Sequence, residues 1–181
     1  PDALRVTDPR WMQRLDKGLD DPRLALARTG VATGTRWSER LPVHLAACPW
    51  IAAWTGLDLH DQPLGPVGAS VLFASPWLGP LRDLNLSGTA LGDAGTLRLV
   101  ACPALSALTS LRLGGCGLGP EGFQSLGDAP FAPTLQHLDL AANGRAWHAR
   151  GQPATHTLTW TRFAALSSLP LTHNNLADQG L

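Results

Sequence analysis

The chain has 181 residues, with 14 basic and 14 acidic residues and a formal net charge of +0 at pH 7. This length allows a sizeable hydrophobic core and is typical of one domain or one part of a larger protein. Because the basic excess needed for phosphate contacts is missing, we expect no nucleic-acid partner, and because no apolar run approaches about 20 residues, we expect no membrane partner.

Cysteine usage indicates a reducing compartment. The three cysteines, Cys48, Cys102 and Cys116, are odd in number and form no CxxC pair. This pattern argues against a disulfide framework or a zinc module and favours reduced thiols. We therefore expect a cytoplasmic protein that uses no metal and no other cofactor.

Residues 1–20 form a flank that precedes the repeated part of the chain. Thr7 or Asp8 is placed to cap a helix that begins at Pro9. Four apolar residues would share one side of that helix: Trp11, Met12, Leu15 and Leu19. Since stacked repeats need a polar-backed terminal cap, we expect a capping helix here, with a partner-binding helix as the alternative.

From residue 21 to residue 181 the hydrophobic pattern repeats, in about five to six units. Reference leucines recur every 27 residues at Leu57, Leu84, Leu111 and Leu138, and Leu169 follows after 31. A second leucine lies two positions after each of them, which predicts a strand with one buried face. The segment after each strand predicts a returning helix. One unit cannot bury its own apolar face, whereas stacked units can.

The first and last units are irregular. The first has Leu24 as its reference leucine and Asp21 where another leucine belongs, and it lies 33 residues before Leu57 (24 to 57). We therefore expect extra residues in an irregular segment at 32–42. At the other end, Pro170 lies between the two leucines of the last strand, so that strand is an edge or its ladder is broken. The pattern then stops just after a repeat glycine, so we expect the array to be truncated at the C-terminus.

The position five residues after each reference leucine holds a small or polar side chain. There the backbone turns away from the strand and leaves amide and carbonyl groups inside the coil. We expect an internal ladder of side chains that satisfies these groups, with Cys116 as a member of it rather than a reactive nucleophile. The predicted ladder consists of Thr29, Gln62, Thr89, Cys116, Asn143 and Asn174.

The returning segments carry signals for helix ends. Asp93 and Asp178 occupy the capping position, and Pro66 and Pro120 take the same place in other units. We expect the recurring glycine, as at Gly95, to be required by close helix packing. A proline eight residues before the next reference leucine is expected to end each helix: Pro49, Pro76, Pro103 and Pro130.

The unit LxxLxLxx(N/T/C/Q)xLxxxG, as in LSGTALGDAG and LTSLRLGGCGLGPEG, resembles the ribonuclease-inhibitor-like class of leucine-rich repeats. The stretch LVACPALSALTSLRL resembles bacterial proteins of that class. The resemblance covers about residues 21–181. It implies an α/β fold, a right-handed solenoid with a parallel sheet on the concave side and helices on the convex side. It also implies an interaction surface, and it carries over no catalytic residue.

The unit that spans residues 143–160 departs from the pattern. It contains Trp147 and Trp160 together with His148 and His156. We weigh two interpretations, a drifted repeat whose packing Trp160 helps to rebuild, and a binding loop from which Trp147 projects, since Trp and Arg dominate interface hot spots. The two histidines have no nearby carboxylate or cysteine, so we predict no metal site.

The residues that alternate with the buried leucines would face outwards on the concave side. They are small and polar, so this surface lacks the large aromatic anchors of a tight interface. His137 and Asp139 share this face two positions apart, which leaves an acid–base or metal pair as a minor alternative to solvated sheet surface. The candidate partner-binding residues are Asp58, His60, Asp83, Asn85, Arg112, His137, Asp139 and, from the irregular unit, Trp147.

The sequence therefore predicts a non-catalytic protein–protein interaction scaffold that binds a protein partner through its curved repeat surface. We expect no enzymatic activity and no small-molecule substrate, because no Ser/His/Asp order, glycine-rich phosphate loop or carboxylate pair stands out. The alternative is that the chain is the recognition segment of a larger regulatory or effector enzyme whose catalytic domain lies outside it.

Overall fold

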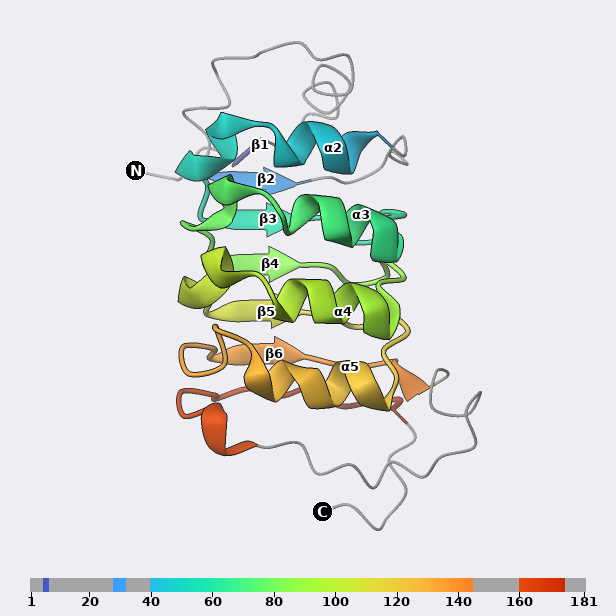
Figure 1. Cartoon of the computed structure of the whole chain (residues 1–181). Coiled ribbons are helices and arrows are strands. Elements are labelled where there is room, and N and C mark those ends of the chain that lie inside the picture. Colours follow the sequence, from blue (N-terminus) through green and yellow to red (C-terminus); the bar gives the residue numbers. More distant parts are fainter. Residues whose placement is uncertain (1–4, 7–27, 32–39, 145–159, 175–181) are drawn as a thin grey trace.

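The computed structural model describes residues 5–6, 28–31, 40–144 and 160–174. The described residues form a six-stranded sheet, in which each strand pairs in parallel with the next one along the sequence. The strands are β1 (Arg5–Val6), β2 (Thr29–Val31), β3 (Gly56–Asp58), β4 (Asp83–Asn85), β5 (Ser110–Arg112) and β6 (His137–Asp139). Figure 1 shows them stacked one above another, so each strand is one level of a coil.

The register of the sheet confirms the 27-residue repeat. Leu57 pairs with Leu84, Leu84 with Leu111, and Leu111 with Leu138. All four side chains are buried. Because parallel strands joined by returning helices cross over in a right-handed sense, the chain forms a right-handed α/β solenoid, as predicted.

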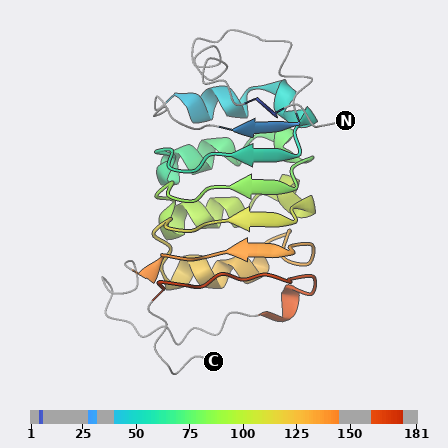
Figure 2. The same ribbon diagram turned by 180° about the vertical axis from the view of Figure 1, so that it is seen from behind.

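Helices cover one face of the sheet, and the strands are seen uncovered from the other face (Figures 1 and 2). The α-helices are α2 (Leu41–Ala46), α3 (Gly65–Leu72), α4 (Gly92–Val100) and α5 (Pro120–Ser125). Short 3-10 helices precede the next strand segments: η2 (Pro49–Ala53), η3 (Pro76–Leu78), η4 (Pro103–Ala107), η5 (Leu126–Asp128) and η6 (Trp160–Arg162). The predicted layers, a concave sheet and convex helices, are confirmed. Within the described ranges no helix is long and apolar enough to cross a membrane.

The prolines do not end the α-helices, contrary to the expectation from the sequence. α3 ends at Leu72 and α4 at Val100, and Pro76 and Pro103 begin separate 3-10 helices a few residues later. Proline is accepted at the start of a helix because no intrahelical partner is needed for its missing N–H there. Pro49, Pro76 and Pro103 therefore open the last part of their crossovers, whereas Pro130 follows the 3-10 helix η5.

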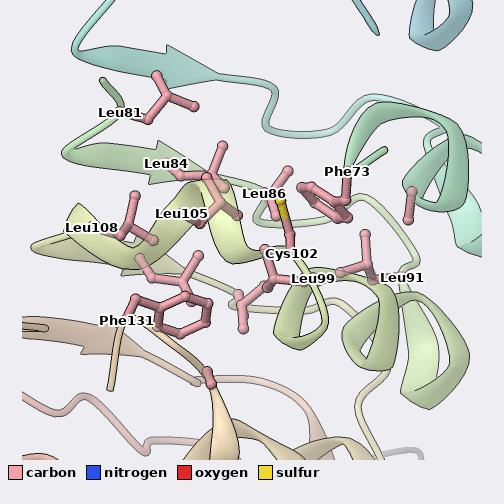
Figure 3. Packing of buried hydrophobic residues seen from close by; sticks show 14 of the residues in the cluster. Phe73, Leu81, Leu84, Leu86, Leu91, Leu99, Cys102, Leu105, Leu108 and Phe131 are labelled. Carbon is pink, nitrogen blue, oxygen red and sulfur yellow. The ribbon is translucent and has the colours of Figure 1, made fainter. Parts of the chain in front are cut away.

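The core lies between the sheet and the helical layer. Figure 3 shows Leu84 and Leu86 from the strand side packed near Leu99 and Leu105 from the helical side. At Gly95 an added Cβ would lie 2.8 Å from the Cγ of Leu91, at the start of the same helix, and 3.5 Å from the Cβ of Ala69 in α3. This glycine therefore leaves room for the Leu91 side chain of its own turn, and not, as predicted, for a neighbouring helix.

The first repeat has a different register from the predicted one. Thr29 pairs with Gly56, and Gly30 pairs with Leu57. Gly30 and not Leu24 therefore takes the reference position, and Thr29 lies in an open-face row rather than in the interior ladder. The reason is Trp54, whose buried ring fills the space of a leucine and would overlap any Cβ on Gly30. Residues 32–39 of the predicted irregular segment lie outside the described residues.

Strand β1 was not predicted. Arg5 pairs with Thr29 and Val6 with Gly30, so part of the N-terminal flank joins the sheet. The helix predicted to begin at Pro9 falls within residues 7–27, which the structure does not describe.

The sheet ladder is interrupted at Pro170. His137 forms an isolated bridge with Ser168, and Leu140 N–H donates to the carbonyl of Pro170 at 3.0 Å. Pro170 has no N–H with which to donate to the neighbouring strand. Of the two predicted alternatives, the locally broken ladder is confirmed.

The interior ladder is confirmed from its second level onwards. Its buried members are Gln62, Thr89, Cys116, Asn143 and Asn174. Asn143 Nδ2 donates to the carbonyls of Leu113 and Leu140, both at 2.9 Å, and Asn174 Nδ2 donates to the Leu140 carbonyl at 2.7 Å. These amides therefore satisfy carbonyls of their own turn, of the preceding turn, or of both.

Cys116 is a hydrogen-bonded member of this ladder. Its Sγ donates to the carbonyl of Leu86 at 2.9 Å and lies 3.8 Å from the Oγ1 of Thr89. Burial raises the pKa of the Cys116 thiol above its ordinary value of 9.0, and hydrogen bonds with Thr89 offset part of this rise. The thiol stays protonated and unreactive at neutral pH, as the sequence predicted.

Asp93 caps the helix of the next turn. It lies in the first turn of α4, and its Oδ1 accepts hydrogen bonds from Gly119 N–H at 2.7 Å and Gly122 N–H at 2.9 Å, at the start of α5. An added Cβ on Gly122 would lie 2.7 Å from this oxygen. The glycine therefore makes room for a carboxylate that joins two neighbouring turns.

Asp93→Ala should lower the free energy of unfolding by about 1–2 kcal/mol, because two N–H groups at the start of α5 lose their acceptor. Chemical denaturation followed by circular dichroism measures the change. Asp93→Asn keeps an oxygen acceptor and is the matched control, with a smaller expected loss. Equal losses in the two variants would contradict capping between turns.

The free energy of unfolding should decrease as the pH rises above about 9. Thiols of the unfolded chain ionise near their ordinary value of 9.0, whereas burial raises the pKa of Cys116 and Cys102 in the folded chain. The folded state then binds more protons than the unfolded state, so stability falls with rising pH. Cys116→Thr, which repeats the residue at Thr89, should reduce this slope. Denaturation midpoints of the wild type and of Cys116→Thr, measured from neutral pH to about pH 10, check this prediction. The same decrease of the midpoint with pH in both proteins would contradict it.

Candidate functional site

The described candidate residues lie on the open side of the sheet, opposite the helices (Figure 2). The sheet register sets them in rows that cross β3, β4, β5 and β6. One row is Gly56, Asp83, Ser110 and His137, and the next is Asp58, Asn85, Arg112 and Asp139. The predicted alternation between buried leucines and outward polar residues is confirmed. Trp147 lies outside the described residues, as do residues 145–159 of its irregular unit.

Arg112 is held across two strands by an ion pair. Its Nη1 donates to Asp83 Oδ1 at 3.0 Å, and the two side chains are 37% and 51% exposed, respectively. An exposed pair of this kind contributes about 0–1 kcal/mol to stability, so its main effect is geometric. The guanidinium has five N–H donors, and the pair fixes it in the middle of the open face.

Three other candidate side chains bond to the backbone two residues further along the chain. In each case the side-chain oxygen accepts from a main-chain N–H, which fixes the direction of the side chain. The pairs are Asp58 with His60 at 3.1 Å, Asn85 with Ser87 at 3.1 Å, and Asp139 with Ala141 at 2.9 Å. Arg112, the remaining residue of the row that contains Asp58, Asn85 and Asp139, bonds to Asp83 instead. The open face thus carries polar groups in fixed positions.

The structure pairs different titratable residues from those that the sequence singled out. Asp58 Oδ1 lies 2.8 Å from His60 Nδ1, a pair that was not predicted. In the described part of the chain, no hydrogen bond or ion pair joins His137 to Asp139, so the acid–base alternative lacks the contact that it needs. Likewise, no group of three or more His, Cys, Asp or Glu side chains in these ranges could hold a metal ion.

The sequence analysis also missed exposed apolar residues on the helical side. Val43 in α2, Val67 in α3 and Leu97 in α4 are 51%, 78% and 47% exposed. The 27-residue spacing places Val43 and Leu97 at the same position of their helices, where the turn between them has Ser70. A position-by-position comparison of the turns in the sequence would have revealed two of these apolar residues, because Val43 and Leu97 are equivalent to the polar Ser70. The described surface is therefore polar on its concave side and partly apolar on its convex side.

Comparison with known proteins supports the repeat assignment. Residues 80–99 and 105–127 match the family described as Leucine Rich repeat. No curated protein matches the chain. A chain from the crystal structure of the Rad7 and Elc1 complex in yeast is similar, with a TM-score of 0.54 and 17% sequence identity over 90% of the present chain. The present chain covers 50% of that one and so spans about half its length.

These similarities agree with the geometry. The two matched segments contain β4 and β5, the strands whose Leu84 and Leu111 pair in the 27-residue register. At 17% identity, the similarity to the yeast structure concerns the fold alone, and the bacterial origin that the resemblance implied has no support here. The chain therefore has the leucine-rich-repeat fold, and two of its turns match the family described as Leucine Rich repeat.

Proposed function

We propose that this chain is a non-catalytic scaffold that binds a protein partner on the concave face of its sheet. The observation that carries the proposal is the shared face, on which polar residues of four neighbouring strand levels stand in register. The candidate contacts are Asp58, His60, Asp83, Asn85, Arg112, His137 and Asp139. Trp147, which lies outside the described residues, is proposed as a further contact.

The proposed mechanism is preorganisation. The strands are fixed by buried leucines, and the Asp58 and Asp139 side chains are fixed by hydrogen bonds to their own backbone. Arg112 is held by Asp83. A partner that binds such a surface orders few additional side chains, so less of the contact free energy is lost as entropy.

A protein partner suits this surface better than a nucleic acid. The described face combines three aspartates with one arginine, whereas phosphate backbones require a basic excess. The similar solved chain belongs to a complex between two proteins, Rad7 and Elc1, which supports a partner of this class. The three cysteines are buried, and their odd number and spacing are in keeping with a reducing, cytoplasmic setting.

A second candidate function is recognition within a larger regulatory or effector enzyme. The present chain covers 50% of the similar solved chain, so this fold occurs together with additional segments. Activity of the full-length protein, measured with and without a partner bound to the repeats, would distinguish this role from that of a simple scaffold.

A two-sided binding experiment tests the concave face. Ser110→Arg combined with His137→Glu places large charged groups in the first row, where both native side chains are half-buried. Val67→Arg, at a 78% exposed position on the convex side, is the matched control. Partners captured by the wild-type chain are purified, and their affinities are measured by calorimetry. We expect the double variant to weaken binding by about tenfold or more and the control to leave it unchanged.

Circular dichroism first establishes that both variants fold as the wild type does. A partner that binds the double variant with full affinity but loses affinity for Val67→Arg would place the interface on the helices and refute the proposal.

A further inference from the structure

Asn143 and Gly144 form the one Asn–Gly pair in the sequence, and the fold requires each residue for its own reason. Asn143 supplies a ladder amide that bonds two buried carbonyls. Gly144 lies against the following turn, where an added Cβ would come within 2.8 Å of the His173 carbonyl oxygen and of the Asn174 carbonyl carbon. Packing thus selects a dipeptide that is chemically labile.

The lability comes from the absence of a Cβ on the second residue, which lets its nitrogen approach the preceding side chain. A base removes the proton from Gly144 N, and this nitrogen attacks Cγ of Asn143. The N–Cγ bond forms, the Cγ–Nδ2 bond breaks, and Nδ2 takes up a proton and leaves as ammonia. Water then opens the cyclic imide at either of its C–N bonds, which yields aspartate or isoaspartate. Water is the co-reactant, and no electrons are transferred.

In the folded chain each reacting atom is held in place. Nδ2 of Asn143 donates to Leu113 and Leu140 at 2.9 Å, and its Oδ1 accepts from Leu118 N–H at 3.1 Å. The nucleophile, Gly144 N–H, donates to the His173 carbonyl at 3.4 Å. Asn143 is 0% exposed, so neither base nor water reaches it.

We propose that Asn143 is a deamidation site that the folded solenoid keeps closed and that opens when this turn unfolds. The product does not fit back into the ladder. An aspartate carboxylate offers no donor to the Leu113 and Leu140 carbonyls, and isoaspartate lengthens the backbone by one atom. Because unpaired buried polar groups and buried charges are unfavourable, each conversion removes a chain from the folded population.

The test compares conversion at residue 143 in the native protein with conversion in urea at the same mildly alkaline pH and temperature. Peptide mapping quantifies aspartate and isoaspartate in the fragment that contains residues 143–144. We expect the native chain to react slower by roughly a hundredfold or more, since only the opened fraction reacts. Asn85 is the internal reference. Because the following residue, Leu86, has a Cβ, Asn85 should convert far more slowly in urea than Asn143 does. Equal rates in native and unfolded protein, or at Asn85 and Asn143 in urea, would overturn the proposal.

Refolding tests the consequence separately from the chemistry. Chains aged in urea are diluted into buffer, and the converted fraction should remain unfolded while the unconverted fraction refolds. Asn143→Thr carries the residue that the same ladder has at Thr89 and cannot form the imide, so its refolding yield should not change with ageing. If Asn143→Thr does not fold, the converted and unconverted wild-type chains are separated, and their refolding is compared directly. Converted chains that refold to the wild-type unfolding midpoint would rule out the loss from the folded population.

Discussion

Each turn of this solenoid depends on its neighbours to complete both its apolar and its polar interior. Leu111 is buried because Leu84 and Leu138 stand beside it at the adjacent levels. Asn143 bonds to the Leu113 carbonyl of the preceding turn and receives the Leu118 N–H of that same turn. A single turn would leave these groups without partners, at a cost comparable to the net stability of a small domain. Stacking is therefore the condition on which every other feature rests.

Because the interior fixes the register, the open face can vary. Arg112 occupies a row in which Asp58, Asn85 and Asp139 bond to their own backbone, yet the pairing of β5 with its neighbours is unchanged. The side chains on this face contribute little to holding the turns together, because the ion pair between Arg112 and Asp83 is exposed. The residues of this face can thus change strand by strand without loss of the fold, a property that suits the proposed scaffold role.

The helical side is coupled from turn to turn in a different way. Asp93 of α4 accepts two N–H groups at the start of α5, and Gly122 leaves the space for its carboxylate. Gly95, at the equivalent position of α4, instead leaves room for the Leu91 side chain of its own turn. Glycine at these equivalent positions therefore makes room for a leucine side chain of the same turn in one case and for a carboxylate of the preceding turn in the other.

The sequence by itself determined the repeat, the buried leucines, the strand alternation, the parallel topology and most of the interior ladder. These are periodic properties, and a period can be read without coordinates because each turn meets an equivalent neighbour. The prediction from the sequence placed the first unit wrongly. Gly30 takes the position of a reference leucine there because the Trp54 ring fills the space of the leucine side chain. The sequence also did not predict the contacts between Asp58 and His60 and between Asp83 and Arg112. Only the tertiary structure decided these contacts, because they depend on side-chain directions and on distances between turns, which spacing along one chain does not encode.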